Sequence, residues 1–170
     1  YKEVEALAYD MMISGKDSDA VSVLRLWRAR NISRFDMKLF SQGDYLRCMQ
    51  EENEAEVISK VLYPADDHYE GKSLRLKQQY FLVSASLQNI ISDHKHRYGP
   101  LDQLPQLAAI HINDTHPALA IPELMRILMD ENGFTWDDAW NITTATFAYT
   151  NHTVMSEALE TWQEDLIARR

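Results

Sequence analysis

Hydrophobic and polar positions along the chain predict four strands. The short, largely apolar run at residues 108–112 is typical of a strand that is covered on both faces. Residues 3–13 and 21–30 are rich in β-forming side chains and flank a turn-forming segment, which predicts two antiparallel strands. A fourth, short strand is predicted at residues 147–152. Together with the helical stretches between them, these strands predict an α/β fold.

Two long helices are predicted, and the first has an uneven pattern. It runs between Gly43 and Tyr63, with apolar ends and a polar, largely acidic middle at residues 50–56. Such a middle fits an ordinary solvated face, or a helix that projects from its domain and meets a partner at its tip. The second helix, at residues 72–97, has an apolar stripe that is more typical of a core-facing side than of a cofactor site.

Capping signals predict shorter helices. Thr135 is expected to cap a helix that reaches Thr146, with Trp136, Trp140 and Ile142 facing inward. The remaining expectations are a helix at residues 119–131 closed by Asn132 and Gly133, loops at residues 31–42 and 101–106, a helix cap at Asp36, and surface positions for His94 and His96.

Composition is that of a water-soluble globular protein. The 170 residues suffice for one domain with a core, and 45% of them are hydrophobic. The net charge of −9 argues against a nucleic-acid or anionic-membrane partner, and no apolar run approaches the ~20 residues of a membrane span. Cys48 is the single cysteine, which predicts a reducing, cytoplasmic setting, and no signal peptide appears in the sequence. Because the chain starts without Met and ends within a helix-like pattern, we expect a piece of a longer protein.

Polar residues gather where two predicted strands end. Asn113, Asp114 and His116 crowd into the turn after one strand, and Asn151 and His152 end the other. Open α/β sheets place ligands at the carboxyl ends of their strands, so these residues form a candidate site. Their amide, imidazole and carboxylate groups suit hydrogen bonding to the hydroxyls of a sugar.

A second polar group lies in the loop that follows Pro64. Asp66, Asp67 and His68 fit either a solvated surface turn or a loop that faces a substrate. Arg75 lies in the first turns of the next helix, where the helix dipole disfavours a cation, so we expect a nearby acid, either Asp66 or Asp67.

Other chemistries lack their usual patterns. A zinc site needs three or four ligands at recognisable spacing, whereas His111 and His116 stand five residues apart and no HExxH motif is present. Cys48 has no local histidine to activate its thiol. The sequence contains no GxGxxG, P-loop or GxSxG motif, so dinucleotide and serine-hydrolase sites are also disfavoured.

Several segments resemble the glycogen, starch and maltodextrin phosphorylases. They occur in the order of that family and span essentially the whole chain: LRLW at 24–27, VLYP at 61–64, EGKSLRLKQQYF at 70–81, NDTHPALAIPELMR at 113–126 and AYTNHTV at 148–154. The resemblance implies an enzyme that cleaves α-1,4-glucans with inorganic phosphate, releases glucose 1-phosphate and uses pyridoxal phosphate as its cofactor.

The resemblance also implies an architecture. Members of the family have two Rossmann-like domains, a GT-B type of fold, with the active site between them. Residues 1–170 would be an internal part of the N-terminal domain, and the cofactor lysine and phosphate-binding basic residues would lie outside this chain. The isolated chain should then be inactive. The rival interpretation is a non-catalytic glucan-binding or assembly module of the same fold.

Individual residues match positions with known roles in the family. His152 matches the catalytic-site histidine that contacts the sugar. Residues 64–71 match a mobile gate loop, although Asp67 stands where many members carry Asn and His68 where some carry Phe. The substrate-binding residues implied by the resemblance are Asp66, Asp67, Arg75, Asp114, His116 and His152.

Two further implications concern assembly and regulation. The helix between Gly43 and Tyr63 resembles a projecting helix that packs against its mate in a homodimer. Ser92 and Asp93 fall where allosterically controlled animal members have two arginines for a nucleotide phosphate. Neither side chain supplies that positive charge, so we expect weak or no activation by AMP through this position.

Overall fold

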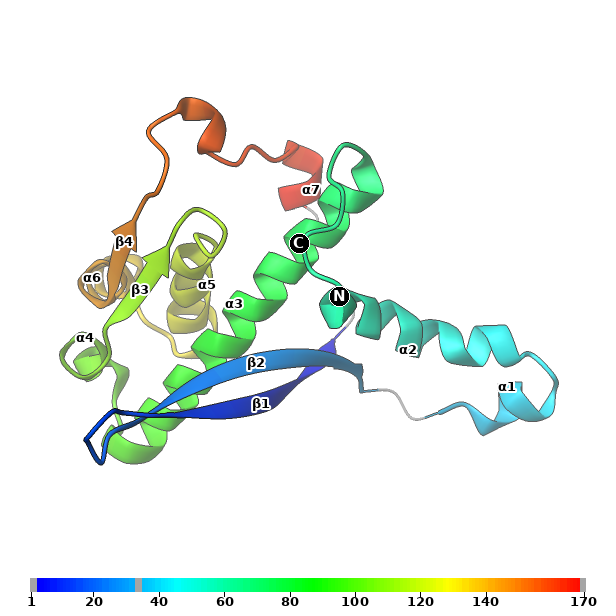
Figure 1. Ribbon diagram of the computed structural model, residues 1–170, viewed down its shortest axis with the longest axis horizontal. Coiled ribbons are helices and arrows are strands. Elements are labelled where there is room, and N and C mark those ends of the chain that lie inside the picture. Colours follow the sequence, from blue (N-terminus) through cyan, green and yellow to red (C-terminus); the bar gives the residue numbers. More distant parts are fainter. Residues whose placement is uncertain (1–2, 33–34, 169–170) are drawn as a thin grey trace. The chain divides into compact units, whose positions relative to one another are not determined.

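A computed structural model describes residues 3–32 and 35–168, and the chain divides into two compact units (Figure 1). The first unit is Tyr1–Phe81 and the second is Leu82–Arg170. Helix α3 (Tyr69–Tyr98) begins in the first unit and ends in the second. Each unit has its own packing and is described by itself.

The first unit begins with a long β-hairpin. Strands β1 (Val4–Ser14) and β2 (Val21–Asn31) pair antiparallel, as the sequence predicts. Cross-strand ion pairs reinforce the register, and one of them joins Arg25 to Asp10 at 2.6 Å. A hydrogen bond from this guanidinium lowers the pKa of the Asp10 carboxyl below its usual value.

Two capped helices follow the hairpin. Residues 31–42 were expected to be a loop, but they contain a short helix, α1 (Met37–Ser41). As predicted, Asp36 caps this helix, and its side chain accepts hydrogen bonds from two backbone N–H groups. Helix α2 (Tyr45–Lys60) confirms the first long helix with slightly narrower bounds, and Asp44 is its cap. Its second half packs on β2, where the Ala29 N–H donates to the Ser59 hydroxyl at 2.9 Å.

Helix α3 differs from the prediction at its start and in one histidine. It begins three residues earlier than the expected Lys72, so the polar loop before it is shorter. His94 is not a surface residue, because only 4% of it is exposed. Its Nε2 atom lies 2.9 Å from the Pro100 carbonyl oxygen, so the imidazole bonds to the chain just beyond the helix end.

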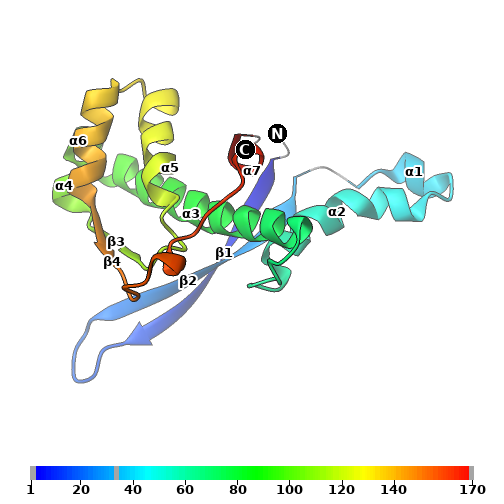
Figure 2. The same cartoon turned by 90° about the horizontal axis from the view of Figure 1, so that it is seen from above.

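The second unit contains a parallel strand pair connected through helices. Strands β3 (Ile110–Asn113) and β4 (Phe147–Thr150) pair parallel, with Asn113 opposite Thr150. The connection between them is a helical hairpin, in which α5 (Ala120–Arg126) and α6 (Trp136–Thr146) lie side by side (Figure 2). The elements of this unit after α3 are a 3-10 turn (Leu101–Gln103), α4 (Leu104–Leu107), β3, α5 (Ala120–Arg126), a π-helical turn (Ile127–Glu131), α6 (Trp136–Thr146), β4, a 3-10 turn (Ser156–Ala158) and α7 (Glu164–Ala168).

The strands of the described residues form two separate two-stranded sheets. The expected α/β class is therefore confirmed as mixed helix and strand, while the described strands do not by themselves form the expected layered, Rossmann-like sheet. The predicted connector at residues 101–106 is likewise not a plain loop, because it contains a 3-10 turn and α4.

The hydrophobic core of the second unit lies between β3 and its helices. Ile112 is 2% exposed and joins one cluster with Leu104, Leu124 and Leu128. Helix α6 contributes small or branched residues to its buried side: Ala139, Ile142, Thr143 and Thr146. The predicted inward positions of Trp136 and Trp140 are wrong, since 59% and 45% of these side chains are exposed. The helix turns its small residues toward its neighbours, which allows close approach.

A buried charge network ties α5 to α3 in the second unit. The Glu123 side chain is 2% exposed and accepts hydrogen bonds from the Ser84 hydroxyl at 2.6 Å and from Arg126 Nε at 2.8 Å. Arg126 also pairs with Glu131 at 2.8 Å, but 49% of that glutamate side chain is exposed. Burying a carboxylate is costly unless it is paired, so removing a partner from the network should be expensive.

We predict that Glu123→Ala weakens the second unit far more than Glu131→Ala. The first change removes the buried acceptor that Ser84 and Arg126 share, which should cost about 2 kcal/mol. The second removes only an exposed ion pair, which should cost under ~1 kcal/mol. Native-state hydrogen exchange of the α5 amides in the full-length protein measures both changes. Equal opening free energies for the two variants would contradict the network's importance.

Candidate functional site

The turn after β3 is held by hydrogen bonds to the end of β4. The Asp114 N–H donates to the Thr150 carbonyl at 2.8 Å, which extends the parallel ladder by one residue. Asp114 has a φ of 70°, a left-handed conformation that short polar residues tolerate. Its carboxylate accepts the Thr115 N–H at 2.7 Å. The chain therefore leaves β3 in a fixed direction.

The two predicted strand ends meet through Asn113 and His152. His152 Nε2 lies 2.6 Å from Asn113 Oδ1, across the end of the β3–β4 pair. An amide oxygen only accepts hydrogen bonds, so Nε2 carries the proton and donates it. In the neutral imidazole Nδ1 is then an acceptor, which suits a hydroxyl donor. The predicted juxtaposition of the two strand ends is confirmed for this pair.

His116 has a partner that the sequence did not suggest. Its Nδ1 lies 2.7 Å from Glu160 Oε1, and 18% of the glutamate side chain is exposed against 40% of the histidine. Glu160 follows the 3-10 turn Ser156–Ala158 and stands far from His116 in sequence. No periodicity or motif connects the two positions, so only the fold of the chain brings this carboxylate to the histidine.

In the first unit, the loop after Pro64 supplies the acid expected near Arg75. Asp66 Oδ2 lies 3.8 Å from Arg75 Nε, and the Arg75 guanidinium lies 5.5 Å from the centroid of the Tyr63 ring. The Asp67 side chain is 90% exposed and lies 3.5 Å from His68 Nδ1. Asp66 is thus the acid near Arg75, and Asp67 extends toward solvent.

The six predicted site residues fall into two sets. Asp66, Asp67 and Arg75 belong to the first unit, whereas Asp114, His116 and His152 belong to the second. In the first set Asp66 lies beside Arg75. In the second set each residue contacts a partner outside the set: Asp114 contacts Thr150, His116 contacts Glu160, and His152 contacts Asn113.

The described residues lack the side-chain groups that a metal site needs. Among residues 3–32 and 35–168, no group of three or more His, Cys, Asp or Glu side chains could hold a metal ion. No helix in the same ranges has the length and apolar character needed to cross a bilayer. A lysine that carries an aldehyde cofactor needs an enclosed pocket, but no described lysine is buried. The described residues therefore do not fit the aldehyde end of pyridoxal phosphate.

The sequence matches the model of one protein family, "Carbohydrate phosphorylase", over residues 1–170. The chain belongs to the carbohydrate phosphorylase family. The expected family resemblance is thereby confirmed along the whole sequence.

Individual relatives agree with this family membership. The chain is 53% identical over 167 residues to a glycogen phosphorylase of Pasteurella multocida, covering 98% of this chain and 20% of the relative. It is 50% identical over 168 residues to the glycogen phosphorylase of Haemophilus influenzae, with 99% and 20% covered. The liver form of human glycogen phosphorylase is 49% identical over 174 residues, with 98% and 20% covered. The chain thus spans about one fifth of the length of the curated relatives it matches.

Gly71 provides a test of the polar loop in the first unit. A Cβ atom added there would lie 1.7 Å from the Ala65 carbonyl oxygen and 2.6 Å from His68 Cε1. We predict that Gly71→Ala displaces residues 65–68, because the obstructing atom is backbone and cannot simply rotate away. The Lys72 N–H donates to the His68 carbonyl oxygen at 3.1 Å, so hydrogen exchange of the Lys72 amide in the full-length protein should become faster. Lys77→Ala, on an exposed position of the same helix, is the control, and an unchanged loop in Gly71→Ala would contradict the observed packing.

Proposed function

We propose that this chain is part of an α-1,4-glucan phosphorylase, which uses inorganic phosphate to release glucose 1-phosphate from glycogen or maltodextrin. The segment would supply the side of the active site that binds the sugar. The observation that carries this proposal is the Asn113–His152 pair at the carboxyl ends of two parallel strands. Ligands of α/β proteins bind at such strand ends, and the family membership supplies the reaction.

His152 is the proposed catalytic residue of this segment. With Nε2 donating to Asn113, Nδ1 faces away from that bond and can accept a hydrogen bond from a sugar hydroxyl. A hydrogen bond that is better aligned in the transition state than in the bound substrate accelerates the reaction. Asn113 contributes by fixing the imidazole tautomer and ring orientation.

The other five residues are also proposed to bind substrate, as the family resemblance implies. Asp114 is fixed by the turn after β3. Glu160 orients the His116 ring by accepting a hydrogen bond from its Nδ1–H group. In the first unit, the ion pair with Asp66 holds Arg75 beside the gate loop. The exposed carboxylate of Asp67 is available to accept a hydroxyl proton, a role that many family members would give to an asparagine.

The proposed full-length protein has the GT-B architecture, with residues 1–170 inside its N-terminal domain. The parallel β3–β4 pair and its helical crossover are compatible with part of a Rossmann-like sheet. Pyridoxal phosphate would be held by residues outside this chain and would contribute proton transfer through its phosphate group. A cytoplasmic location is also proposed, on the basis of the lone Cys48.

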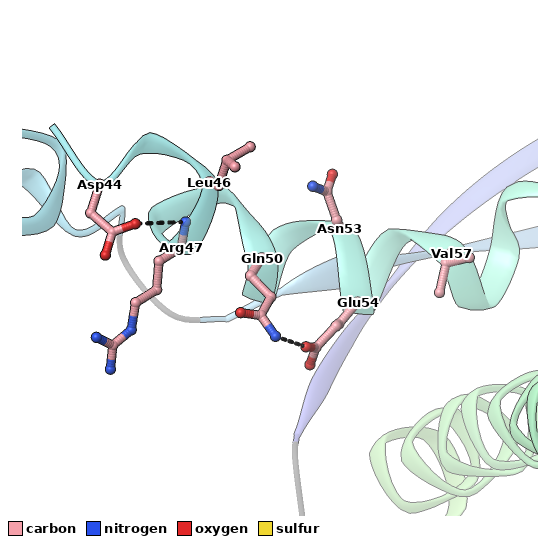
Figure 3. A pocket seen from close by; sticks show the side chains of 7 residues that line it. All are labelled: Asp44, Leu46, Arg47, Gln50, Asn53, Glu54 and Val57. Carbon is pink, nitrogen blue, oxygen red and sulfur yellow. Dashed lines mark hydrogen bonds between the residues drawn. The ribbon is translucent and has the colours of Figure 1, made fainter.

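Helix α2 is the proposed homodimer contact. Its first half carries apolar side chains in water: Leu46 is 89% exposed, and Tyr45 and Met49 are also exposed. A shallow hollow lies along this helix, and Figure 3 shows the side chains that line it, among them Gln50, which donates to Glu54. Burying the apolar side chains against a second copy would remove them from water. The residues that line the hollow are Asp44, Leu46, Arg47, Gln50, Asn53, Glu54 and Val57.

We predict that His152→Ala in the full-length protein lowers kcat/KM for glucan about tenfold, as expected for one lost hydrogen bond to the transition state. Asn113→Leu should lower it less, because the ring remains but is no longer oriented. The double variant should be no worse than His152→Ala, since Asn113 acts through the histidine. Initial rates of phosphorolysis measure these changes, with Asn141→Leu on the exposed side of α6 as the control. Normal kinetics in His152→Ala would refute the proposed role.

We also predict that Leu46→Glu shifts the full-length protein from dimer to monomer at micromolar concentration. A charge in the centre of an apolar contact must be desolvated without a partner, which is costly. Leu46→Met preserves the volume and apolar character and should remain dimeric. Analytical ultracentrifugation compares the two variants. A dimer of undiminished affinity in Leu46→Glu would place the interface elsewhere.

A further inference from the structure

His111 and Thr150 form a second polar pair beside the Asn113–His152 pair. His111 Nε2 lies 2.6 Å from Thr150 Oγ1, and His152 Nε2 lies 2.6 Å from Asn113 Oδ1. Each bond joins residues that are 39 positions apart in sequence. The Asn113–His152 bond therefore lies two residues further along both segments, with its histidine just after β4 instead of on β3.

Strand geometry places these side chains on one face. Residues two apart on a strand share a face, so His111 and Asn113 lie together, and Thr150 lies directly opposite Asn113. Ile112, between them, points to the other face and is 2% exposed in the core. The buried isoleucine thus fixes which side of the strand pair carries the polar residues.

Thr150 has a second contact with the proposed site. Its backbone carbonyl accepts the Asp114 N–H at 2.8 Å, while its hydroxyl bonds to His111. It is also only two residues from His152. One residue therefore connects the His111 ring, the turn that carries Asp114, and the strand end that carries His152.

We propose that His111 and Thr150 are a positioning pair that fixes the end of β4 and thereby the orientation of His152 toward the sugar. This inference rests on the proposed glucan phosphorylase function. With its hydroxyl bonded to His111, Thr150 is held in one rotamer beside Asn113. Small displacements of a residue that contacts the reacting sugar are sufficient to reduce turnover. Neither His111 nor Thr150 itself needs to contact the substrate.

Isosteric substitutions in the full-length enzyme separate this role from simple packing. Thr150→Val keeps the branched shape without the hydroxyl, and His111→Phe keeps the ring without its nitrogens. Each should lower kcat/KM for glucan about fivefold, the size expected for one neutral hydrogen bond. The double variant should lose no more than either single variant, because both remove the same bond. Thr150→Ser and His111→Gln retain groups that can make the bond and should recover most of the activity.

The KM for inorganic phosphate is the discriminating measurement. Loss of positioning on the sugar side leaves this KM unchanged, whereas a distortion that spreads through the whole active site raises the KM for both substrates. Unchanged glucan kinetics in Thr150→Val and His111→Phe, additive losses in the double variant, or a parallel rise of the phosphate KM would overturn the inference. Absence of phosphorolysis in the unmodified full-length protein would instead refute the proposed function, so the two failures are distinguishable.

Discussion

The candidate site depends on the parallel pairing of β3 and β4, two four-residue strands joined by a helical hairpin. Because Ile112 is held in the core, alternation along the strand turns Asn113 to the opposite face. The same pairing brings His152 to Asn113, and the ladder continues through the Asp114 N–H. A shift of one residue in this register would exchange the buried and polar faces and remove the site.

The packing around the pair explains how such short strands can hold a fixed geometry. Helix α5 follows directly after the site turn, and its Glu123 is anchored in the interior by Ser84 and Arg126. Helix α6 leads directly into β4 and buries Thr143 and Thr146 at that end. Both helices are therefore fixed at the ends that lead into the candidate site. The packing of α5 and α6 therefore both stabilises the second unit and fixes the positions of the candidate site residues.

Local chemistry in the sequence was sufficient to predict several features. Short-range rules predicted the caps at Asp36 and Thr135 and an acid near Arg75, which the structure identifies as Asp66. The general geometry of α/β sheets predicted the meeting of two polar strand ends. Features set by tertiary contacts were not predictable. His94 is buried, and its imidazole bonds to the Pro100 carbonyl oxygen beyond the end of the helix. Glu160 lies far from His116 in sequence and is brought to it only by the fold. Trp136 and Trp140 matched an apolar pattern, yet the helix buries its smaller residues.

The Asn113–His152 pair is the proposed sugar contact of this chain, in which His152 accepts a hydrogen bond from a sugar hydroxyl. The most direct measurement is a crystal structure of the full-length enzyme with a bound maltooligosaccharide. The account predicts a sugar hydroxyl within hydrogen-bonding distance of His152 Nδ1, with Nε2 still donating to Asn113. A sugar bound away from His152, or an imidazole turned away from Asn113 to meet it, would contradict the account.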